Sequence, residues 1–426
     1  MHKAQPGGGN HPVPARGGIM NQSLFYLFAV LTGIAVIAYV FQLAAVRSKL
    51  SQARKTANYS PLTDPSPFFP ISVIKPLKGL DDNLFDNLVS FCDQDYQRYE
   101  VIFSLQNTND PAYKIAQKVK TKHPECDITI LVEQCALGLN PKVNNLIPAA
   151  GKAKYEHILI SDSNVMVGRD YLRETARHMH DPDVGLVTNL IRGVRARSLG
   201  SVLENLHLNS FIIGSVCFLD QYLNMPCVIG KSMLMRKADL NAIGGFMAVK
   251  DVLAEDYVIG KLIHDHGKKV VLADYAVNNI NEFWSLKKFM NRHTRWGKLR
   301  WKIGGMKYLS ELFGNAVFIS CMPLLLTGLT ALNAALVIGV SSIKIAGDMH
   351  LGRKTASGMH PLSYFLAPAK DIIIGCIWFV PLLSNTVAWR GNRYIIGNNS
   401  MLSPYPENST WSWQYRIITS IKAKFA

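Results

Sequence analysis

Charged residues are scarce in this sequence. Asp, Glu, Lys and Arg make up 18% of its 426 residues, whereas soluble domains average about 25%. With 48% hydrophobic residues, the chain cannot be intrinsically disordered, because disorder requires few apolar and many charged residues. The length allows two or three domains. An ordinary soluble enzyme is also disfavoured, since so many apolar residues must be concentrated somewhere.

Closely spaced cysteine pairs are lacking as well. None of the seven cysteines forms a CxxC or CxxxC pair: Cys92, Cys126, Cys135, Cys217, Cys227, Cys321 and Cys376. Zinc sites and disulfide frameworks usually show such regular spacing. The sequence therefore predicts neither, and it favours a reducing, cytoplasmic compartment.

Acidic residues are outnumbered by basic ones, 30 against 46, which gives a formal net charge of +16. A basic excess can serve nucleic-acid binding, but no nucleic-acid motif appears and much of the excess flanks apolar runs. We therefore expect a membrane surface as partner, and no nucleic acid.

The apolar residues are concentrated in a few runs. Residues 23–46 carry no charge, and such a helix would cross a hydrocarbon core of roughly 30 Å. A cleaved signal peptide would have an apolar core of only about 7–15 residues and a small-residue cleavage site. Because this run is longer and is followed by Arg47 and Lys49, we predict an anchor with the following domain in the cytoplasm.

Two further runs lie near the C-terminus. Residues 313–343 are long for one span and short for two, with Gly328 and Asn333 near the middle, so the count stays open. Residues 372–389 are expected to form a short span despite Pro381, whereas 211–219 is too short for one and indicates core or an interfacial element. The predicted organisation is a disordered tail (1–22), an anchor (23–46), a linker (47–70), a cytoplasmic domain (71–310), a C-terminal membrane region of two or three spans (311–390) and a tail (391–426).

Short apolar runs alternate with amphipathic segments in the cytoplasmic region. The predicted strands are 71–74, 100–105, 128–132 and 157–160, and the predicted helices are 83–94, 111–123 and 143–151. This alternation is typical of an α/β fold with a doubly wound, mostly parallel sheet. Such sheets bind ligands beyond the carboxyl ends of their strands.

Polar residues follow these strands where a ligand is expected. Asp162 and Asn164 come directly after the fourth strand, and a carboxylate with a nearby oxygen donor suits a divalent cation that also holds phosphates. The same residue types also form ordinary turns.

Two later segments carry charged residues with open interpretations. Asp256 precedes an apolar helix and could be a helix cap or a functional acid. Arg292 and Arg295 share a helix face and could clamp a diphosphate or contact lipid head groups.

Taken together, the motifs resemble those of a known family. They are KPLKGLD (75–81), NPKVNNL (140–146), ISDSNV (160–165), GKSMLMRK (230–237), AEDY (254–257) and RHTRW (292–296). This ordered series resembles the ceramide glucosyltransferases, which are membrane-bound, nucleotide-sugar-dependent enzymes of the GT-A fold. Bacterial hopanoid-biosynthesis glycosyltransferases are near relatives. The resemblance extends weakly to residues 389–394.

The resemblance implies roles for individual residues. Asp256 matches the general base, and Asp162 matches the metal-linked aspartate, with Asn164 in the third position of that motif. The (Q/R)xxRW motif corresponds to Arg292, Arg295 and Trp296, which would offset leaving-group charge and line the acceptor site. The predicted donor-binding residues are Lys75, Asp81, Lys142, Asn144, Asp162 and Asn164.

The function implied is transfer of a single hexose, most simply glucose, from a UDP-sugar to the primary hydroxyl of a membrane lipid such as ceramide. The mechanism would be inverting, with Mg²⁺ or Mn²⁺. Arg292 stands where processive polysaccharide synthases usually have Gln, which favours single transfer. N-acetylglucosaminyl transfer to a hopanoid polyol, a polysaccharide synthase and a noncatalytic scaffold are the alternatives. The expected location is the bacterial inner membrane, or a Golgi-type membrane in a eukaryote.

Overall fold

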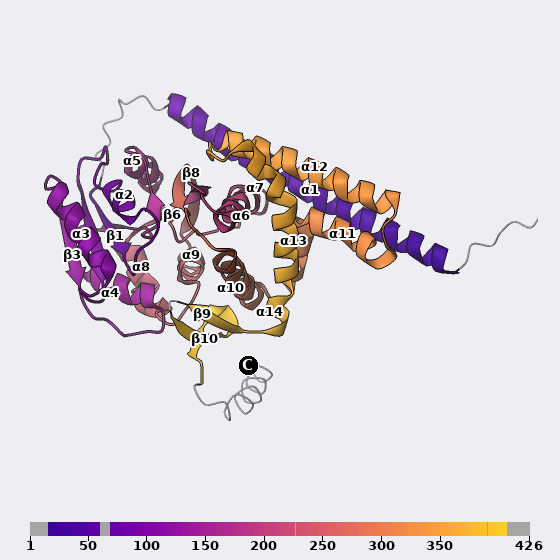
Figure 1. Ribbon diagram of the computed structural model, residues 1–426. Helices are drawn as coiled ribbons and strands as arrows, with labels where there is room; N and C mark the ends of the chain where they lie inside the picture. The colour runs from indigo at the N-terminus through magenta and orange to yellow at the C-terminus, as the bar shows by residue number, and fades with distance from the viewer. Residues whose placement is uncertain (1–15, 60–68, 226, 390, 407–426) are drawn as a thin grey trace, which may run out of the picture.

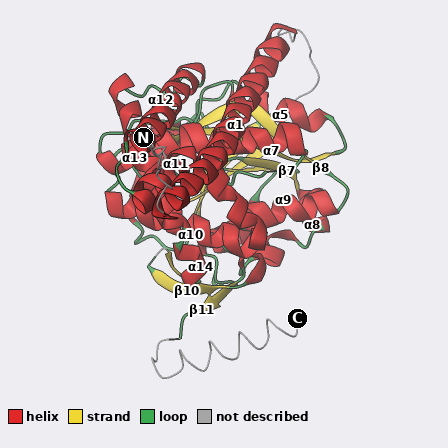
Figure 2. Cartoon of the chain, turned by 90° about the vertical axis from the view of Figure 1, so that its right-hand side faces the viewer, coloured by secondary structure: helices red, strands yellow, loops and turns green. Residues whose placement is uncertain are grey.

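The computed structural model describes residues 16–59, 69–225, 227–389 and 391–406. A sheet with its covering helices forms one side of the molecule, and long apolar helices form the other (Figure 1). Helices α6 (Leu199–His207), α7 (Ile213–Leu223) and α10 (Leu286–Gly304) lie between these two parts in this view. Figure 2 shows the molecule from the side of the long apolar helices. Residues 60–68 of the predicted linker fall outside the described residues.

One half of the eight-stranded sheet is parallel and agrees closely with the sequence prediction. Its strands run in the order β3-β2-β1-β4, with the bounds β1 (Ile71–Pro76), β2 (Tyr99–Leu105), β3 (Ile128–Val132) and β4 (His157–Ile160). The connecting helices are α2 (Leu84–Val89), α3 (Pro111–Lys122) and α4 (Pro141–Lys152). Helix α2 is much shorter than the predicted 83–94, since the chain turns away after Val89.

The other half of the sheet is mixed, which modifies the predicted mostly parallel arrangement. It continues from β4 in the order β7-β6-β8-β5, with β7 (Met233–Arg236), β6 (Val184–Val194), β8 (Lys269–Ile280) and β5 (Val165–Met166). Strand β7 pairs antiparallel with both β4 and β6, and β5 pairs antiparallel with β8, while β6 and β8 are parallel. Helices cover this half as well: α5 (Tyr171–Ala176), η1 (Arg177–His180), α8 (Lys237–Ala242), η3 (Gly245–Val249) and α9 (Glu255–Asp265).

Both faces of the sheet are buried. Successive strand residues point to opposite sides, so neighbours on one strand belong to different cores. On β1, Val73 belongs to the core on one face and Ile74 to the core on the other, and both are fully buried. A doubly covered sheet of this kind leaves its strand ends, rather than its faces, to carry a binding site.

The apolar residues 211–219 belong to a much longer helical segment than the sequence indicated. It comprises α6 (Leu199–His207), the π-turn η2 (Leu208–Ile212) and α7 (Ile213–Leu223). Together, Leu199–Leu223 is long and apolar enough to cross a membrane by length and composition, so residues 211–219 are part of a longer apolar segment than the sequence indicated. Because Glu204, His207 and Asn209 interrupt the apolar residues, the sequence alone does not indicate one long apolar segment. About 67% of its most apolar window is buried inside the protein, which favours packing over lipid contact.

The predicted anchor forms a helix that extends beyond both predicted ends. Helix α1 covers Arg16–Tyr59, so part of the predicted tail and most of the predicted linker are helical. Its candidate span is Met20–Gln52, and 17% of that window is buried. The Tyr39 hydroxyl donates to Asp348 Oδ1 at 2.7 Å, which joins α1 to α12 (Ala331–Lys354) inside the helical bundle.

Residues 313–343 contain a helical hairpin. Helix α11 (Ala316–Thr327) ends before Gly328, and α12 begins at Ala331. Gly328 has a φ of 87°, a left-handed conformation that glycine adopts without steric cost. The Asn333 side chain donates to the Gly328 carbonyl and the Thr327 hydroxyl, which fixes the turn.

The predicted span 372–389 ends earlier than expected. Helices α13 (Ala367–Trp378) and α14 (Val380–Leu383) follow η5 (Pro361–Leu366), and the chain then enters a three-stranded sheet: β9 (Thr386–Trp389), β10 (Asn392–Ile396) and β11 (Leu402–Pro404), with η6 (Asn398–Ser400) between the last two. Hydropathy alone does not separate a short helix from an apolar strand, so the sequence analysis merged β9 with the helix. Part of the predicted tail 391–426 is therefore folded.

Among the described residues, four helical segments are long and apolar enough to cross a membrane: Met20–Gln52, Leu199–Leu223, Ala331–Lys354 and Pro361–Leu383. A fifth arises if the bent pair of Leu286–Gly314 and Ala316–Thr327, with an angle of 78°, counts as one span. The first part of this pair is α10 (Leu286–Gly304) with η4 (Gly305–Gly314).

Candidate active site

A cavity of about 820 Å³ opens beyond the carboxyl ends of β1 and β4, where the sequence analysis placed a ligand. It is bounded by the loops after these strands, the starts of α4 and α9, helix α10 and strand β9. Eight of the ten predicted site residues line it: Asp81, Lys142, Asp162, Asn164, Asp256, Arg292, Arg295 and Trp296. The fold thus brings six motifs, spread over more than two hundred residues, to one cavity.

Two lysines hold the Asp162 carboxylate. The Lys142 ammonium lies 2.9 Å from Oδ1 and the Lys231 ammonium lies 2.9 Å from Oδ2. Burial by itself would raise the pKa of this carboxyl, but the two ammonium groups hold it well below its usual range. Lys231 also donates to the side-chain oxygen of Asn164 at 2.7 Å. Asp162 is therefore a permanent anion in a cationic setting, which suits the binding of a diphosphate.

Local sequence explains where Lys142 lies. Asn140 caps α4 by accepting from the Lys142 and Val143 backbone N–H groups, and proline occupies the first helical turn, where its missing N–H costs nothing. The side chain of Lys142 then reaches Glu255 at 2.9 Å and the Gly230 carbonyl at 3.2 Å, besides Asp162. Burial opposes its charge, yet the Asp162 and Glu255 carboxylates raise the pKa of Lys142 above its ordinary value.

Lys75 and Asn144 do not line the cavity. Lys75 is fully buried beneath Asp162, donating to its backbone carbonyl at 2.7 Å with its ammonium over the Phe91 ring. Burial lowers the pKa of Lys75 well below its ordinary value. Asn144 bonds to both the N–H and the carbonyl of Gly138 and so closes a loop. The donor-binding roles of both residues stay predictions.

Asp81 lies on the cavity wall and accepts a hydrogen bond from the Ser163 hydroxyl. Its neighbour Asp82 accepts from the backbone N–H of Glu282 at 2.8 Å and so ties the loop after β1 to the segment that follows β8. The bond from Ser163 to Asp81 also holds the loop after β1 against the loop after β4, which carries Asp162.

Asp256 is held at the start of α9 by the backbone. The Gly230 N–H donates to its Oδ2 at 2.8 Å and the Tyr257 N–H donates to Oδ1 at 2.8 Å. A side chain at position 230 would collide with this carboxylate. Burial raises the pKa of Asp256, and the charge of adjacent Glu255 raises it further, to about 6. A carboxylate tuned toward neutrality is what general base catalysis requires.

Arg292 is fixed from three sides. Its guanidinium lies over the rings of Trp284 and Trp296, 5.0 and 4.2 Å from their centroids, and Glu204 approaches its Nη1 at 3.4 Å. Glu204 is fully buried and also pairs with His293 at 2.9 Å. A buried carboxylate must be paired, so Glu204 constrains where Arg292 can point.

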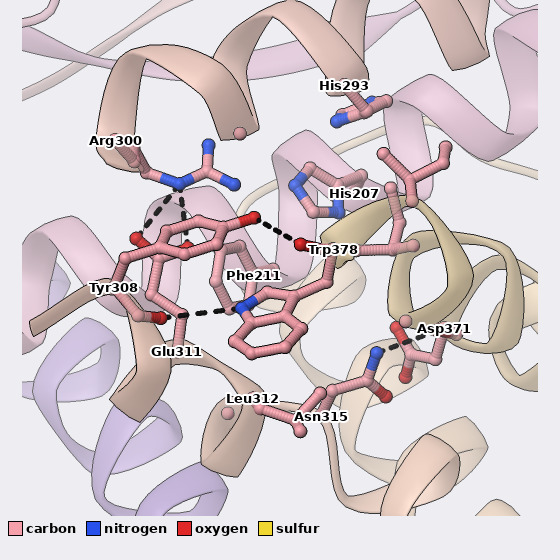
Figure 3. Close-up of a pocket in the computed structure, with 15 residues that line it drawn as sticks. His207, Phe211, His293, Arg300, Tyr308, Glu311, Leu312, Asn315, Asp371 and Trp378 are labelled. Carbon is pink, nitrogen blue, oxygen red and sulfur yellow. Dashed lines mark hydrogen bonds and ion pairs between the residues drawn. The ribbon is translucent and has the colours of Figure 1, made fainter. Parts of the chain in front are cut away.

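Helix α10 serves two cavities with two adjacent faces. Arg292, Arg295 and Trp296 line the large one, whereas His293 and Arg300 line a cavity of about 30 Å³ against α13. Figure 3 shows the small cavity, where Arg300 donates to the Glu311 carboxylate, the Tyr308 hydroxyl to the Trp378 carbonyl and the Asn315 amide to the Asp371 carbonyl. Because one water needs about 10–15 Å³, the small cavity has room for a few water molecules and is too small for a sugar nucleotide.

A divalent cation at Asp162 would compete with two ammonium groups, because Lys142 and Lys231 contact the two carboxylate oxygens and Lys231 also donates to Asn164. It fits there only if the phosphates of a donor take over these ammonium contacts. Among the residues that the structure describes, no group of three or more His, Cys, Asp or Glu is placed to hold a metal. The protein would supply the Asp162 carboxylate and the Asn164 amide oxygen. Mg²⁺ is commonly held by one or two carboxylates plus substrate phosphates, so this donor set suits a cation that binds with the diphosphate.

Sequence reasoning did not assign three residues that shape the site. Lys231 lies inside a quoted motif, and its placement directly before β7 could have identified it. Asn140 carries the Asn-Pro signal of a helix start, which was readable. Glu204 lies 88 positions before Arg292, and nothing local reveals their pairing.

If Asp256 is the general base that the resemblance implies, its carboxylate must be ionised to accept a proton, so activity should follow its titration. With a pKa of about 6, kcat/KM should be constant above neutrality and fall about tenfold per pH unit below 6. Asp256→Asn should lower turnover by roughly 10²–10⁴ with donor affinity kept, and should remove this inflection. An inflection near pH 6 that persists in Asp256→Asn would assign the base to another residue.

If Glu204 positions Arg292, its charge should matter to the donor side of the reaction. Glu204→Gln keeps the shape and removes the charge that faces Arg292, so we expect kcat/KM for the sugar nucleotide to fall roughly tenfold. Glu311→Gln, which loses the partner of Arg300 on the other face of α10, is the matched control. Equal losses in both variants would indicate a merely structural role.

Sequence comparison places the chain among glycosyltransferases. The sequence model of glycosyl transferase family 21 matches residues 27–402. Ceramide glucosyltransferase 1 of Caenorhabditis elegans is 28% identical over 346 residues, covering 78% of this chain and 72% of that protein. Ceramide glucosyltransferase 3 of the same organism is 26% identical over 395 residues, covering 88% and 83%.

Among solved structures, the mannosyltransferase PcManGT from Pyrobaculum calidifontis, in complex with GDP-Man and Mn²⁺, is 16% identical with a TM-score of 0.45. The match covers 82% of this chain and 99% of that one. The predicted GT-A fold class and the resemblance to ceramide glucosyltransferases are confirmed by the family match and the observed architecture. Because the family model matches residues 27–402, which is most of the chain, this protein belongs to glycosyl transferase family 21.

Proposed function

We propose that this glycosyltransferase moves a single glucose from UDP-glucose to the primary hydroxyl of ceramide, with inversion at the anomeric carbon. The observation that carries the proposal is the placement of Asp256. Its carboxylate, with a pKa of about 6, lies in the same cavity as the cationic cluster around Asp162. The names of the C. elegans relatives favour ceramide over a hopanoid polyol as acceptor.

The cationic residues bind the diphosphate of the donor. Lys142 and Lys231 flank Asp162, and Arg292 and Arg295 project from α10 into the cavity. These positive charges stabilise the negative charge that develops on departing UDP. A divalent cation held at Asp162, when bound, supplies further charge neutralisation there. Asp81 faces the same space and is assigned to the uridine end of the donor.

Asp256 accepts the proton of the acceptor hydroxyl as that oxygen attacks the anomeric carbon. Two backbone N–H groups fix the carboxylate, so the basic oxygen is oriented before the substrate arrives. An inverting single displacement requires one such base and no enzymic nucleophile. Glu255 is engaged by Lys142, which leaves Asp256 as the carboxylate available for proton transfer.

The bilayer supplies the acceptor, which accounts for apolar helices at both ends of the catalytic domain. Helix α10 carries Trp296 and several basic residues next to the bent junction with α11. Tryptophan and basic side chains favour the head-group level of a membrane. We assign this helix to the interface, with the catalytic cavity on the cytoplasmic side.

Product analysis tests the assignment. Purified protein in detergent should form hexosylceramide when given ceramide and UDP-glucose, with lower rates for UDP-galactose and UDP-N-acetylglucosamine, as measured by mass spectrometry. Transfer of N-acetylglucosamine to a hopanoid polyol but not of glucose to ceramide would replace the proposal. A ladder of multiply glycosylated products would indicate a polysaccharide synthase.

Chelation forms a second arm of the same assay. Excess EDTA should abolish transfer, and Mg²⁺ or Mn²⁺ should restore it, because Asp162 is expected to share a cation with the diphosphate. Undiminished transfer in EDTA would leave the diphosphate to Lys142, Lys231 and the two arginines.

A further inference from the structure

The large cavity is not polar throughout. Besides its charged residues it is lined by apolar side chains from β6, η2, α7, the segment before β7 and α10: Ile191, Ile212, Val216, Cys227, Ile229 and Trp296. Cys227 lies close enough to Asp256 for that carboxylate to raise its pKa, after the larger effect of burial. Apolar wall therefore extends to the immediate surroundings of the base.

The π-turn η2 directs two of these residues into the cavity. Asn209, within this turn, bonds to both the N–H and the carbonyl of Gly193 at the end of β6, at 2.7 and 2.9 Å. The turn is thereby fixed to the sheet, and Ile212 and Val216, four residues apart, fall on one helical face. Single π-turns of this kind are frequent at functional sites.

The same helical segment contacts the membrane anchor. Ile213 and Cys217 of α7 share a buried cluster with Ala45 and Val46 of α1, and Lys49 pairs with Asp220 at 2.9 Å. Helix α7 thus separates the catalytic cavity from a helix long and apolar enough to cross a bilayer.

Apolar residues close together in the sequence lie between this contact and the base. At the end of α7, Tyr222, Leu223 and Met225 are about half exposed, and the Tyr222 ring meets Phe41 of α1. The chain then continues through Cys227 and Ile229, which line the cavity, to Gly230, whose N–H holds Asp256. Exposed apolar side chains beside a membrane helix mark a lipid contact.

We propose that this surface is the acceptor track: Ile212, Val216, Tyr222, Leu223, Met225, Cys227 and Ile229 receive an aliphatic chain of the lipid acceptor and guide its hydroxyl to Asp256. This proposal rests on the proposed function and specifies which part of the substrate these residues bind. The occupant is a membrane-borne aliphatic chain, because the track begins beside a membrane helix and ends at the base. Burial of methylene groups along it makes acceptor affinity depend on chain length.

Kinetics with acceptors of different length test the track. Ile212→Trp places a larger side chain on the track, so the KM for a ceramide with a sixteen-carbon acyl chain should rise roughly tenfold or more. The KM for UDP-glucose, and the KM for a two-carbon acyl ceramide, should change less than about threefold. Leu199→Trp, on the exposed start of α6, adds the same ring away from the cavity and should leave both acceptors unchanged.

Photocrosslinking decides the matter if Ile212→Trp folds poorly. A ceramide with a diazirine in its acyl chain, irradiated with the wild-type protein, should label peptides containing residues 212–225 and 227–229. Equal rises in KM for long and short acceptors, or labels confined to α12 and α13, would overturn the track. Both results presuppose that wild-type protein glycosylates ceramide, so failure of the proposed function would appear separately as absence of product.

Discussion

The ammonium group of Lys142 is the constraint on which the site depends. It contacts Asp162 from the loop after β4, Glu255 from the start of α9 and the carbonyl of Gly230 from the segment before β7. Three motifs that are far apart in the sequence are thereby set at fixed positions around one partly buried cation. Burial and the charge of Glu255 raise the pKa of adjacent Asp256, while the Lys142 ammonium lowers it. Donor binding and base strength are thus coupled through a single side chain.

The architecture places this polar centre beside an apolar wall. The sheet supplies the charged residues at its strand ends, while η2, α7 and α10 supply the apolar ones. Both sets are needed for a reaction between a water-soluble sugar nucleotide and a lipid that stays in the bilayer. In the proposed function, helices at both ends of the domain hold the cavity next to the membrane, so the acceptor hydroxyl has only a short distance to move from the interface to the base.

Several features could be predicted from the sequence because their signals are local. Strand β3 matches its predicted range, since its four apolar residues and Thr129 stand between polar segments. Asp162 and Asp256 were found from their places at a strand end and a helix start. The pairing of Glu204 with Arg292 could not be found, because it joins distant positions and exists only in the packed structure. Likewise β9 was taken for the end of a helix, because a short apolar run is compatible with either structure until its partner strand is known.

The central claim is a direct displacement by a lipid hydroxyl that Asp256 deprotonates. The anomeric configuration of the product measures this most directly. UDP-glucose carries an α linkage, so the account predicts a β-linked glucosyl lipid. The coupling constant of the anomeric proton, measured by nuclear magnetic resonance, identifies the linkage. An α-linked product would contradict it, because retention requires a second displacement or a front-side mechanism in which Asp256 is not the base described here.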